Sequence, residues 1–177
     1  AAFRGIGAAW EASNLRRIYR RVEPGLIRVE ADEVTYPAHI LLRTEIEQAL
    51  LLGDLAVADL PGAWRDRMQE LLGLDVANDR DGCMQDIHWY SGAVGYFPTY
   101  TLGALAAAQL FAAATAADDG ILKGIAAGDF APLFVWLREH VHGHGSRLST
   151  DLLLQRATGR PLNVDAFRDH LEARYLS

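Results

Sequence analysis

The chain has 177 residues, half of them apolar, a formal net charge of −6 and a single cysteine. This length allows one sizeable core and argues against a second complete domain. The acidic balance, without any run of like charges, disfavours nucleic acid and anionic membrane surfaces as partners. The lone Cys83 excludes an internal disulfide and is predicted to be a packing residue rather than a nucleophile.

Two features missing from the sequence bear on the cellular location of the protein. From the sequence we expect no apolar run to reach the length of a membrane span, and the first residues lack the long apolar core of a secretion signal. With one cysteine, these features predict a soluble, cytoplasmic protein.

Helical periodicity dominates the first half of the chain. Apolar and charged residues interleave from about 8 to 22, and Pro24 and Gly25 then stop this helix. Residues 27–32 alternate apolar and charged side chains, which predicts a short extended segment. A long helix is predicted from Thr35 and Pro37 to Gly53.

The remaining elements are also helical. A helix is predicted over 59–73, followed by a polar, turn-rich loop at 78–82. The next helix, about 99–117, is rich in alanine and glycine, and we expect it to be buried. Three shorter helices, near 132–142, 149–158 and 164–175, complete the chain. The fold class is therefore mainly α.

Hydrogen-bonding and proton-transfer groups are concentrated between residues 82 and 100. This segment carries an amide, a carboxylate, an imidazole, an indole and two phenols, which are Gln85, Asp86, His88, Trp89, Tyr96 and Tyr100. A purely structural loop seldom needs so many such groups, so the segment is the candidate active site.

Each of these residues also has a simpler interpretation. His88 can donate to an oxyanion or move a proton, but it can equally be a buried structural histidine. Gln85 and Asp86 can orient that imidazole or bind substrate, or else cap their own turn. Tyr96 and Tyr100, four residues apart, can be ordinary aromatic packing.

Arg28 is a further candidate from outside this segment. It lies four residues before Asp32, with which it can form a salt bridge. A guanidinium left free in a cleft is instead well shaped to bind a carboxylate through two parallel hydrogen bonds. The spacing does not choose between the two interpretations.

His140 and His144 have the separation that places two imidazoles on one helical face for zinc. The residue after His140 is valine rather than glutamate, glycines follow, and no third ligand is evident. The sequence therefore predicts no metal site in this chain, and a polar helix end is the simpler interpretation.

Two motifs, in order along the chain, resemble a known family. The segments 26–36 and 82–89 are similar to the I/V-R-x-x-A-D and G-x-x-Q-D-x-H-W motifs of the zinc metallocarboxypeptidases named for carboxypeptidase Taq. The segments 95–103, 157–159 and 170–175 are similar to that family's C-terminal pattern. The likeness runs from about Tyr19 to the last residue and is highly specific.

The resemblance implies a helical fold with a deep groove, a homodimer, and removal of single residues from the C-termini of peptides. It also implies zinc or cobalt, held by a His-Glu-x-x-His helix and a downstream glutamate that precede the matched segment. Residues 1–177 therefore resemble the C-terminal portion of a single peptidase domain. We expect them to lack the metal ligands and to be inactive alone.

The resemblance also implies roles for individual residues. Arg28 would bind the substrate's terminal carboxylate, and His88 and Tyr100 would stabilise the oxyanion or position the substrate. The wall around them would comprise Gln85, Asp86 and Trp89, with Tyr96 as a further member. An alternative function is a non-catalytic helical interaction module, which would associate through an exposed apolar face.

Overall fold

The computed structural model describes residues 7–176, and within that range it contains helices, turns and loops but no strand. This confirms the mainly α prediction. Short 3-10 helices lie at Ala8–Trp10, Arg28–Glu30, Val57–Asp59 and His142–His144. The α-helices are α1 (Ala12–Tyr19), α2 (Tyr36–Leu52), α3 (Leu60–Leu72), α4 (Pro98–Ala117), α5 (Gly120–Ala126), α6 (Ala131–His140), α7 (Thr150–Thr158) and α8 (Asp165–Tyr175).

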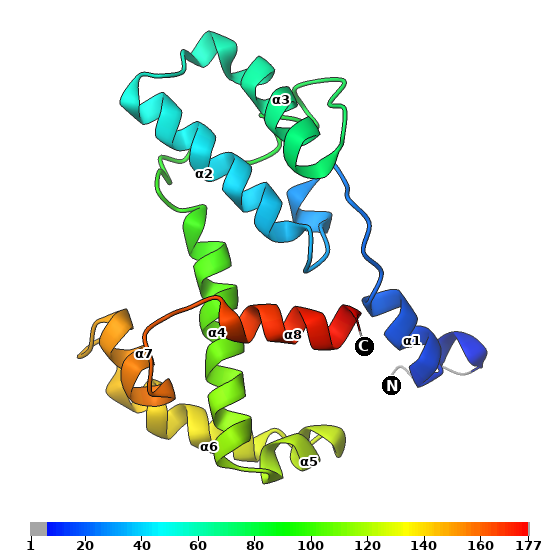
Figure 1. Cartoon of the computed structure of the whole chain (residues 1–177), viewed down its shortest axis with the longest axis vertical. Coiled ribbons are helices and arrows are strands. Elements are labelled where there is room, and N and C mark those ends of the chain that lie inside the picture. Colours follow the sequence, from blue (N-terminus) through cyan, green and yellow to red (C-terminus); the bar gives the residue numbers. More distant parts are fainter. Residues whose placement is uncertain (1–6, 177) are drawn as a thin grey trace. The chain divides into compact units, whose positions relative to one another are not determined.

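The chain divides into two compact units, one up to Thr101 and one from Leu102 onward. The first unit is built on α2 and α3, which pack side by side (Figure 1). Its core comprises Leu42, Ile46, Trp64, Met68, Val76 and Cys83. Burial also raises the pKa of the Cys83 thiol, so this residue packs and is not activated as a nucleophile.

The ends of α2 follow from its sequence. Pro37 occupies the first turn, where its missing N–H removes no helical hydrogen bond. Gly53 ends the helix in the left-handed conformation, with φ of 79°, which a residue with a Cβ adopts only with strain. The N–H groups of Val34 and Thr35 just before α2 both donate to the Asp32 carboxylate.

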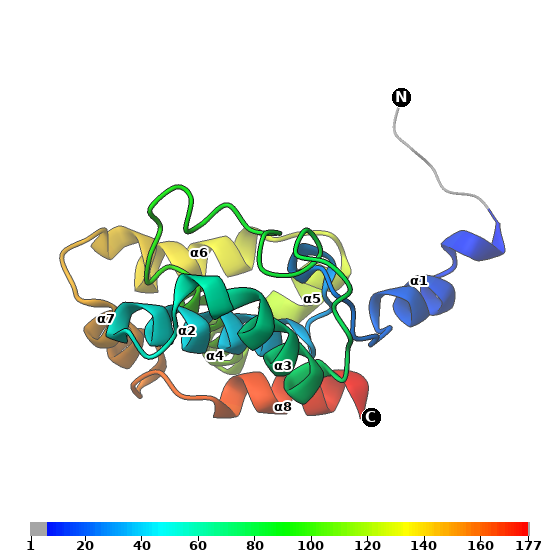
Figure 2. The same ribbon diagram turned by 90° about the horizontal axis from the view of Figure 1, so that it is seen from above.

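The second unit is centred on Ala114, Ile121 and Trp136. Within it α6 contacts both α5 and α7, and Figure 2 shows these helices from above. Gln109 of α4 is buried and donates to the Thr158 hydroxyl and to the carbonyls of Arg160 and Pro161, while its own carbonyl accepts from the Asn163 N–H. One amide thereby fixes the turn between α7 and α8.

Residues 27–32 do not form the predicted extended segment. The N–H groups of Glu30 and Ala31 donate to the carbonyls three residues earlier, which makes a turn of 3-10 helix over Arg28–Glu30. Only the flanking Ile27 and Ala31 keep extended dihedral angles. The alternation of side chains was therefore misleading, because hydrogen bonds within the turn satisfy this backbone without a partner strand.

Helix α4 differs from the prediction in two ways. Only Gln109 and Ala114 are buried along its 20 residues, so the expected burial is wrong within the described chain. By length and composition α4 could also cross a membrane, which corrects the statement that no apolar run is long enough. Core helices share that length and composition.

Helix α5 was not predicted, and the first predicted helix is a 3-10 turn followed by the shorter α1.

Candidate active site

Helix α2 presents three polar side chains at four-residue spacing within an otherwise apolar face. His39, Arg43 and Glu47 are all buried and lie one helical turn apart. The Glu47 carboxylate accepts from the Trp89 indole N–H at 2.7 Å and from the Gly95 N–H at 2.6 Å. Helix α2 therefore holds two points within the segment that carries the candidate catalytic residues.

Arg28 is brought to that segment although 58 positions separate it from Asp86. The Nε and Nη2 groups of Arg28 donate to the same Asp86 oxygen, at 2.9 and 2.7 Å, and Nη1 donates to the Tyr36 hydroxyl at 2.7 Å. The side chain is 7% exposed. Arg28 thus pairs with Asp86 rather than with Asp32, and two of its five N–H groups have no hydrogen bond to the described residues.

Arg43 binds the other oxygen of the same carboxylate. Its Nε donates to Asp86 at 2.6 Å and its Nη1 to the His39 carbonyl at 2.9 Å, and the side chain is fully buried. The guanidinium carbon lies 4.6 Å from the centre of the Trp64 ring, a cation–π distance. The sequence interpretation missed Arg43 and Glu47. The sequence feature that could have revealed them is the spacing of charged residues four apart within an apolar helical face.

The charges of Asp86 and the two arginines change one another's pKa values. Burial alone would raise the pKa of Asp86, but the hydrogen bonds and charges of Arg28 and Arg43 outweigh it and hold that pKa below its usual range. Burial lowers the pKa of Arg43 to about 10 despite the opposing charge of Asp86. At neutral pH the cluster therefore contains two cations and one anion.

His88 and Tyr100 form a pair beside this cluster. The imidazole Nε2 lies 3.0 Å from the Tyr100 hydroxyl, and Nδ1 lies 3.8 Å from Asp86, beyond hydrogen-bond distance. The Phe97 ring packs on the imidazole with 4.3 Å between centres, and the Tyr96 ring lies 5.8 Å away. The guanidinium of Arg28 is 5.1 Å from the centre of the Tyr100 ring. Imidazole and phenol can share one proton, so either can act as a donor.

The other predicted site residues serve different parts of the same region. Gln85 accepts from the Arg28 backbone N–H and donates to the carbonyls of Leu26 and Asp81, so it ties the two motifs together. Trp89 packs against the core, edge-on to Trp64, and is also edge-on to Phe97, the ring that packs on His88. Tyr96 is about half exposed and packs edge-on to Tyr100.

The described residues do not provide a metal site by themselves. Within residues 7–176 no group of three or more histidine, cysteine, aspartate or glutamate side chains could hold an ion. His140 stacks on Trp136 and its Nδ1 lies 3.0 Å from the Trp136 carbonyl, while His144 lies in a separate 3-10 turn.

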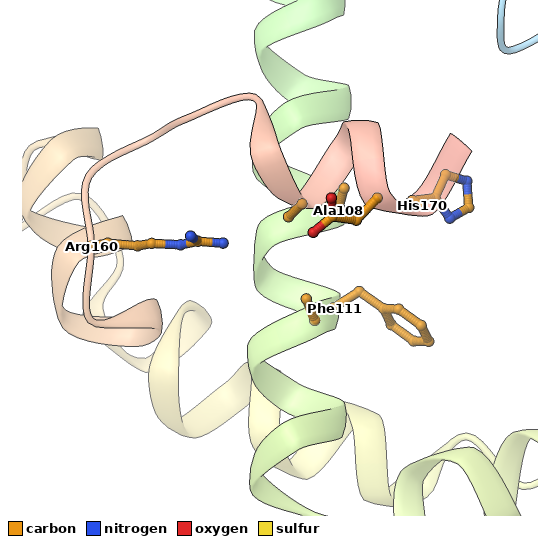
Figure 3. A pocket seen from close by; sticks show the side chains of 7 residues that line it. Ala108, Phe111, Arg160 and His170 are labelled. Atoms are coloured by element: carbon orange, nitrogen blue, oxygen red, sulfur yellow. The ribbon is translucent and has the colours of Figure 1, made fainter. Parts of the chain in front are cut away.

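A separate hollow lies in the second unit, away from these motifs in sequence. It has a volume of about 300 Å³ between α4, α8 and the turn before α8 (Figure 3). Its apolar lining is Ala108, Phe111, Ala112 and Ala166, and its polar lining is Arg160, Asp169 and His170. The three polar side chains are solvent-exposed, so the hollow contains no buried polar group that indicates a ligand among the described residues.

Known proteins resemble this chain over most of its length. The family model of the carboxypeptidase Taq (M32) metallopeptidases matches residues 1–175. The chain belongs to this family. It is 47% identical over 154 residues to thermostable carboxypeptidase 1 of Thermus thermophilus and 41% identical over 162 residues to carboxypeptidase 1 of Bacillus subtilis. These matches cover 87% and 90% of this chain.

Solved M32 structures show the same fold. Metallocarboxypeptidase 1 of Trypanosoma cruzi superposes with a TM-score of 0.93 at 43% identity, covering 98% of this chain. The carboxypeptidase of Deinococcus radiodurans gives 0.88 at 41% identity over 92% of the chain. The chain spans only 30% and 32% of the two curated relatives, and 36% and 33% of these two structures. It corresponds to about a third of an M32 carboxypeptidase.

Proposed function

We propose that this chain supplies the substrate-binding side of a metal-dependent carboxypeptidase, which hydrolyses the C-terminal peptide bond of peptides. The main support for this proposal is the buried Arg28–Asp86–Arg43 cluster, which lies beside the His88–Tyr100 pair. An exopeptidase must recognise a free carboxylate and stabilise a developing oxyanion. A guanidinium suits the first task, and imidazole or phenol donors suit the second.

In this proposal Arg28 binds the terminal carboxylate with the N–H groups that Asp86 and Tyr36 leave available. His88 and Tyr100 donate to the oxyanion or position the peptide. Gln85 holds the backbone N–H of Arg28 and Asp86 holds its guanidinium, and Tyr96 and Trp89 shape the surrounding wall. Carboxylate binding at a nearly dry guanidinium is strong because water competes weakly there.

The metal belongs to the part of the enzyme that this chain does not contain. A bound zinc or cobalt ion would generate the nucleophilic hydroxide and polarise the carbonyl. Because the described residues include no ligand set, we propose that these 177 residues alone are inactive. We further propose a cytoplasmic homodimer. The single cysteine supports the compartment, and the family resemblance supports the dimer.

A hybrid enzyme tests this function. Residues 7–176 would replace the matching segment of the Thermus thermophilus carboxypeptidase, which is 47% identical over 154 residues. We expect the metal-loaded hybrid to cleave an N-blocked dipeptide with a free C-terminus but not its C-terminal amide. The chain alone, with zinc or cobalt added, should give no turnover. Turnover by the isolated chain would refute its proposed inactivity.

Arg28→Met in that hybrid should lower kcat/KM for the free-acid peptide by about 100-fold, because the charge-assisted carboxylate contact is lost. Arg65→Met removes one exposed arginine from α3 and is the matched control, expected to change kcat/KM little. Equal activity of wild type and Arg28→Met would disprove the role of Arg28. A folded hybrid without carboxypeptidase activity would disprove the function.

A further inference from the structure

We propose that Arg43, which touches no substrate, is a positioning residue that keeps Arg28 electrostatically available for the substrate carboxylate. The inference rests on the proposed function and names a residue outside both motif segments. Its basis is the division of one carboxylate between two arginines: Arg28 takes one oxygen of Asp86, and Arg43 takes the other.

Direct substrate contact by Arg43 is excluded by its surroundings. The side chain is 0% exposed, packed over Trp64, and anchored to the His39 carbonyl of its own helix. The Arg28 guanidinium binds the other oxygen of Asp86 and lies next to the Tyr36 and Tyr100 rings. Arg43 therefore acts on the substrate site only through Asp86.

The charge balance shows what that action is. Arg28 and Asp86 alone would be a neutral pair, and a carboxylate approaching Arg28 would meet the repulsion of Asp86 almost as strongly as the attraction of the guanidinium. With Arg43 bound to Asp86, two cations and one anion leave one net positive charge. Unit charges within a buried cluster interact by several times more than in bulk water, so this difference is decisive for anion binding.

The other groups around the cluster do not supply that charge. Tyr36 contributes a neutral hydroxyl, which accepts from Arg28. His39 is uncharged at neutral pH, since burial and the charge of Arg43 lower its pKa to about 4. His88 faces the Asp86 oxygen that Arg28 occupies. Removing the charge of Arg43 would therefore leave only the opposite charges of Arg28 and Asp86, which cancel each other.

Charge compensation separates this role from a merely structural one. Binding to the 177-residue chain would be followed by NMR, with N-acetyl-alanine and its C-terminal amide as the two probes. The wild type should prefer the acid. Arg43→Met should lower the ratio of acid to amide affinity by about tenfold. The double variant Arg43→Met/Asp86→Asn restores one net charge and should recover most of that ratio.

Arg65→Met is the matched control, because it removes one exposed arginine from the same unit, and the ratio should not change. If Arg43→Met retains the wild-type ratio, or if the double variant is no better than the single one, the positioning role is wrong. If Arg43→Met does not fold, the test uses Arg43→Lys and the double variant instead. Both should keep the preference for the acid over the amide. Loss of that preference in both would overturn the proposal. A wild type without any preference for the acid would instead refute the proposed function.

Discussion

At the scale of single residues, the candidate site depends on buried charged groups, of which Arg28, Asp86 and Glu47 have specific hydrogen-bond partners. A buried charge without a partner is strongly destabilising, so Arg43 is tolerated only because Asp86, a helix carbonyl and an indole surround it. Two more residues of the same helical stripe, His39 and Glu47, allow predictions that need no enzyme assay.

His39 should make stability depend on pH. Its pKa is lowered to about 4 by burial and by the charge of Arg43, against the influence of the Gly25 backbone, whereas an unfolded histidine titrates near 6.5. The unfolded chain therefore binds more protons between these values, and stability is complete above about pH 6.5 and falls as the pH drops toward 4. At pH 4 the loss is roughly 3 kcal/mol, from the difference between the folded and unfolded pKa values.

Urea unfolding at several pH values measures this effect. His39→Leu, which is similar in size and cannot titrate, should flatten the dependence between pH 6.5 and 4, while the exposed His142→Leu should not. The same slope in wild type and His39→Leu would show that another group is responsible. The pKa of Asp86 is lowered, so its own protonation affects stability only at more acidic pH.

Glu47→Gln should loosen the segment that carries the site. The carboxylate accepts two N–H donors, and a glutamine would direct its own NH2 group at one of them. We expect a loss of about 2 kcal/mol in unfolding free energy and a shift of the Trp89 indole proton in NMR spectra. Glu45→Gln, on the same helix but in a partly exposed ion pair with Arg67, should cost less than about 1 kcal/mol. Equal losses would contradict the anchoring role of Glu47.

At the scale of elements, helix positions were predictable wherever local chemistry decides them. Pro37 and Gly53 bound α2, and the Ser149 hydroxyl accepts from the Leu152 N–H at the start of α7, close to the predicted limits. The turn at Arg28 was not predictable from its alternation. Neither was the partner of Arg28, because Asp86 is 58 residues away and only tertiary folding brings it closer than Asp32.

The chemistry of the side chains made the motif residues candidates, and the family resemblance added their roles. The structure brings Arg28, Gln85, Asp86, His88, Tyr96 and Tyr100 into one region. Their catalytic and binding roles remain proposals. The supporting residues Arg43 and Glu47 could not be recognised from chemistry-bearing motifs, because each is an isolated charge among apolar neighbours in α2.

Gln109 is the corresponding anchor in the second unit, and Gln109→Leu should destabilise the turn between α7 and α8. The substitution removes three donor contacts and leaves the Asn163 N–H without its acceptor. We expect a loss of about 1–3 kcal/mol and faster hydrogen exchange at Asn163. Gln155→Leu removes a single contact at an exposed position and is the control. Unchanged exchange at Asn163 would show that the turn is held by other contacts.

At the scale of the whole molecule, the chain comprises two compact units and about a third of the length of its relatives. Every described contact of the candidate site lies within the first unit, up to Tyr100 in the first turn of α4. The second unit keeps a core and a polar anchor of its own. We therefore expect the carboxylate-binding chemistry to depend on the first unit.

The regular placement of His39, Arg43 and Glu47 along α2 makes the site sensitive to insertions. One extra residue between Arg43 and Glu47 would rotate everything beyond it by about 100° around the helix axis. Glu47 would then face away from Trp89 and Gly95, while the composition of the helix stayed nearly the same. Chains that keep both motifs but carry such an insertion should therefore have lost the two hydrogen bonds through which Glu47 anchors the candidate site segment.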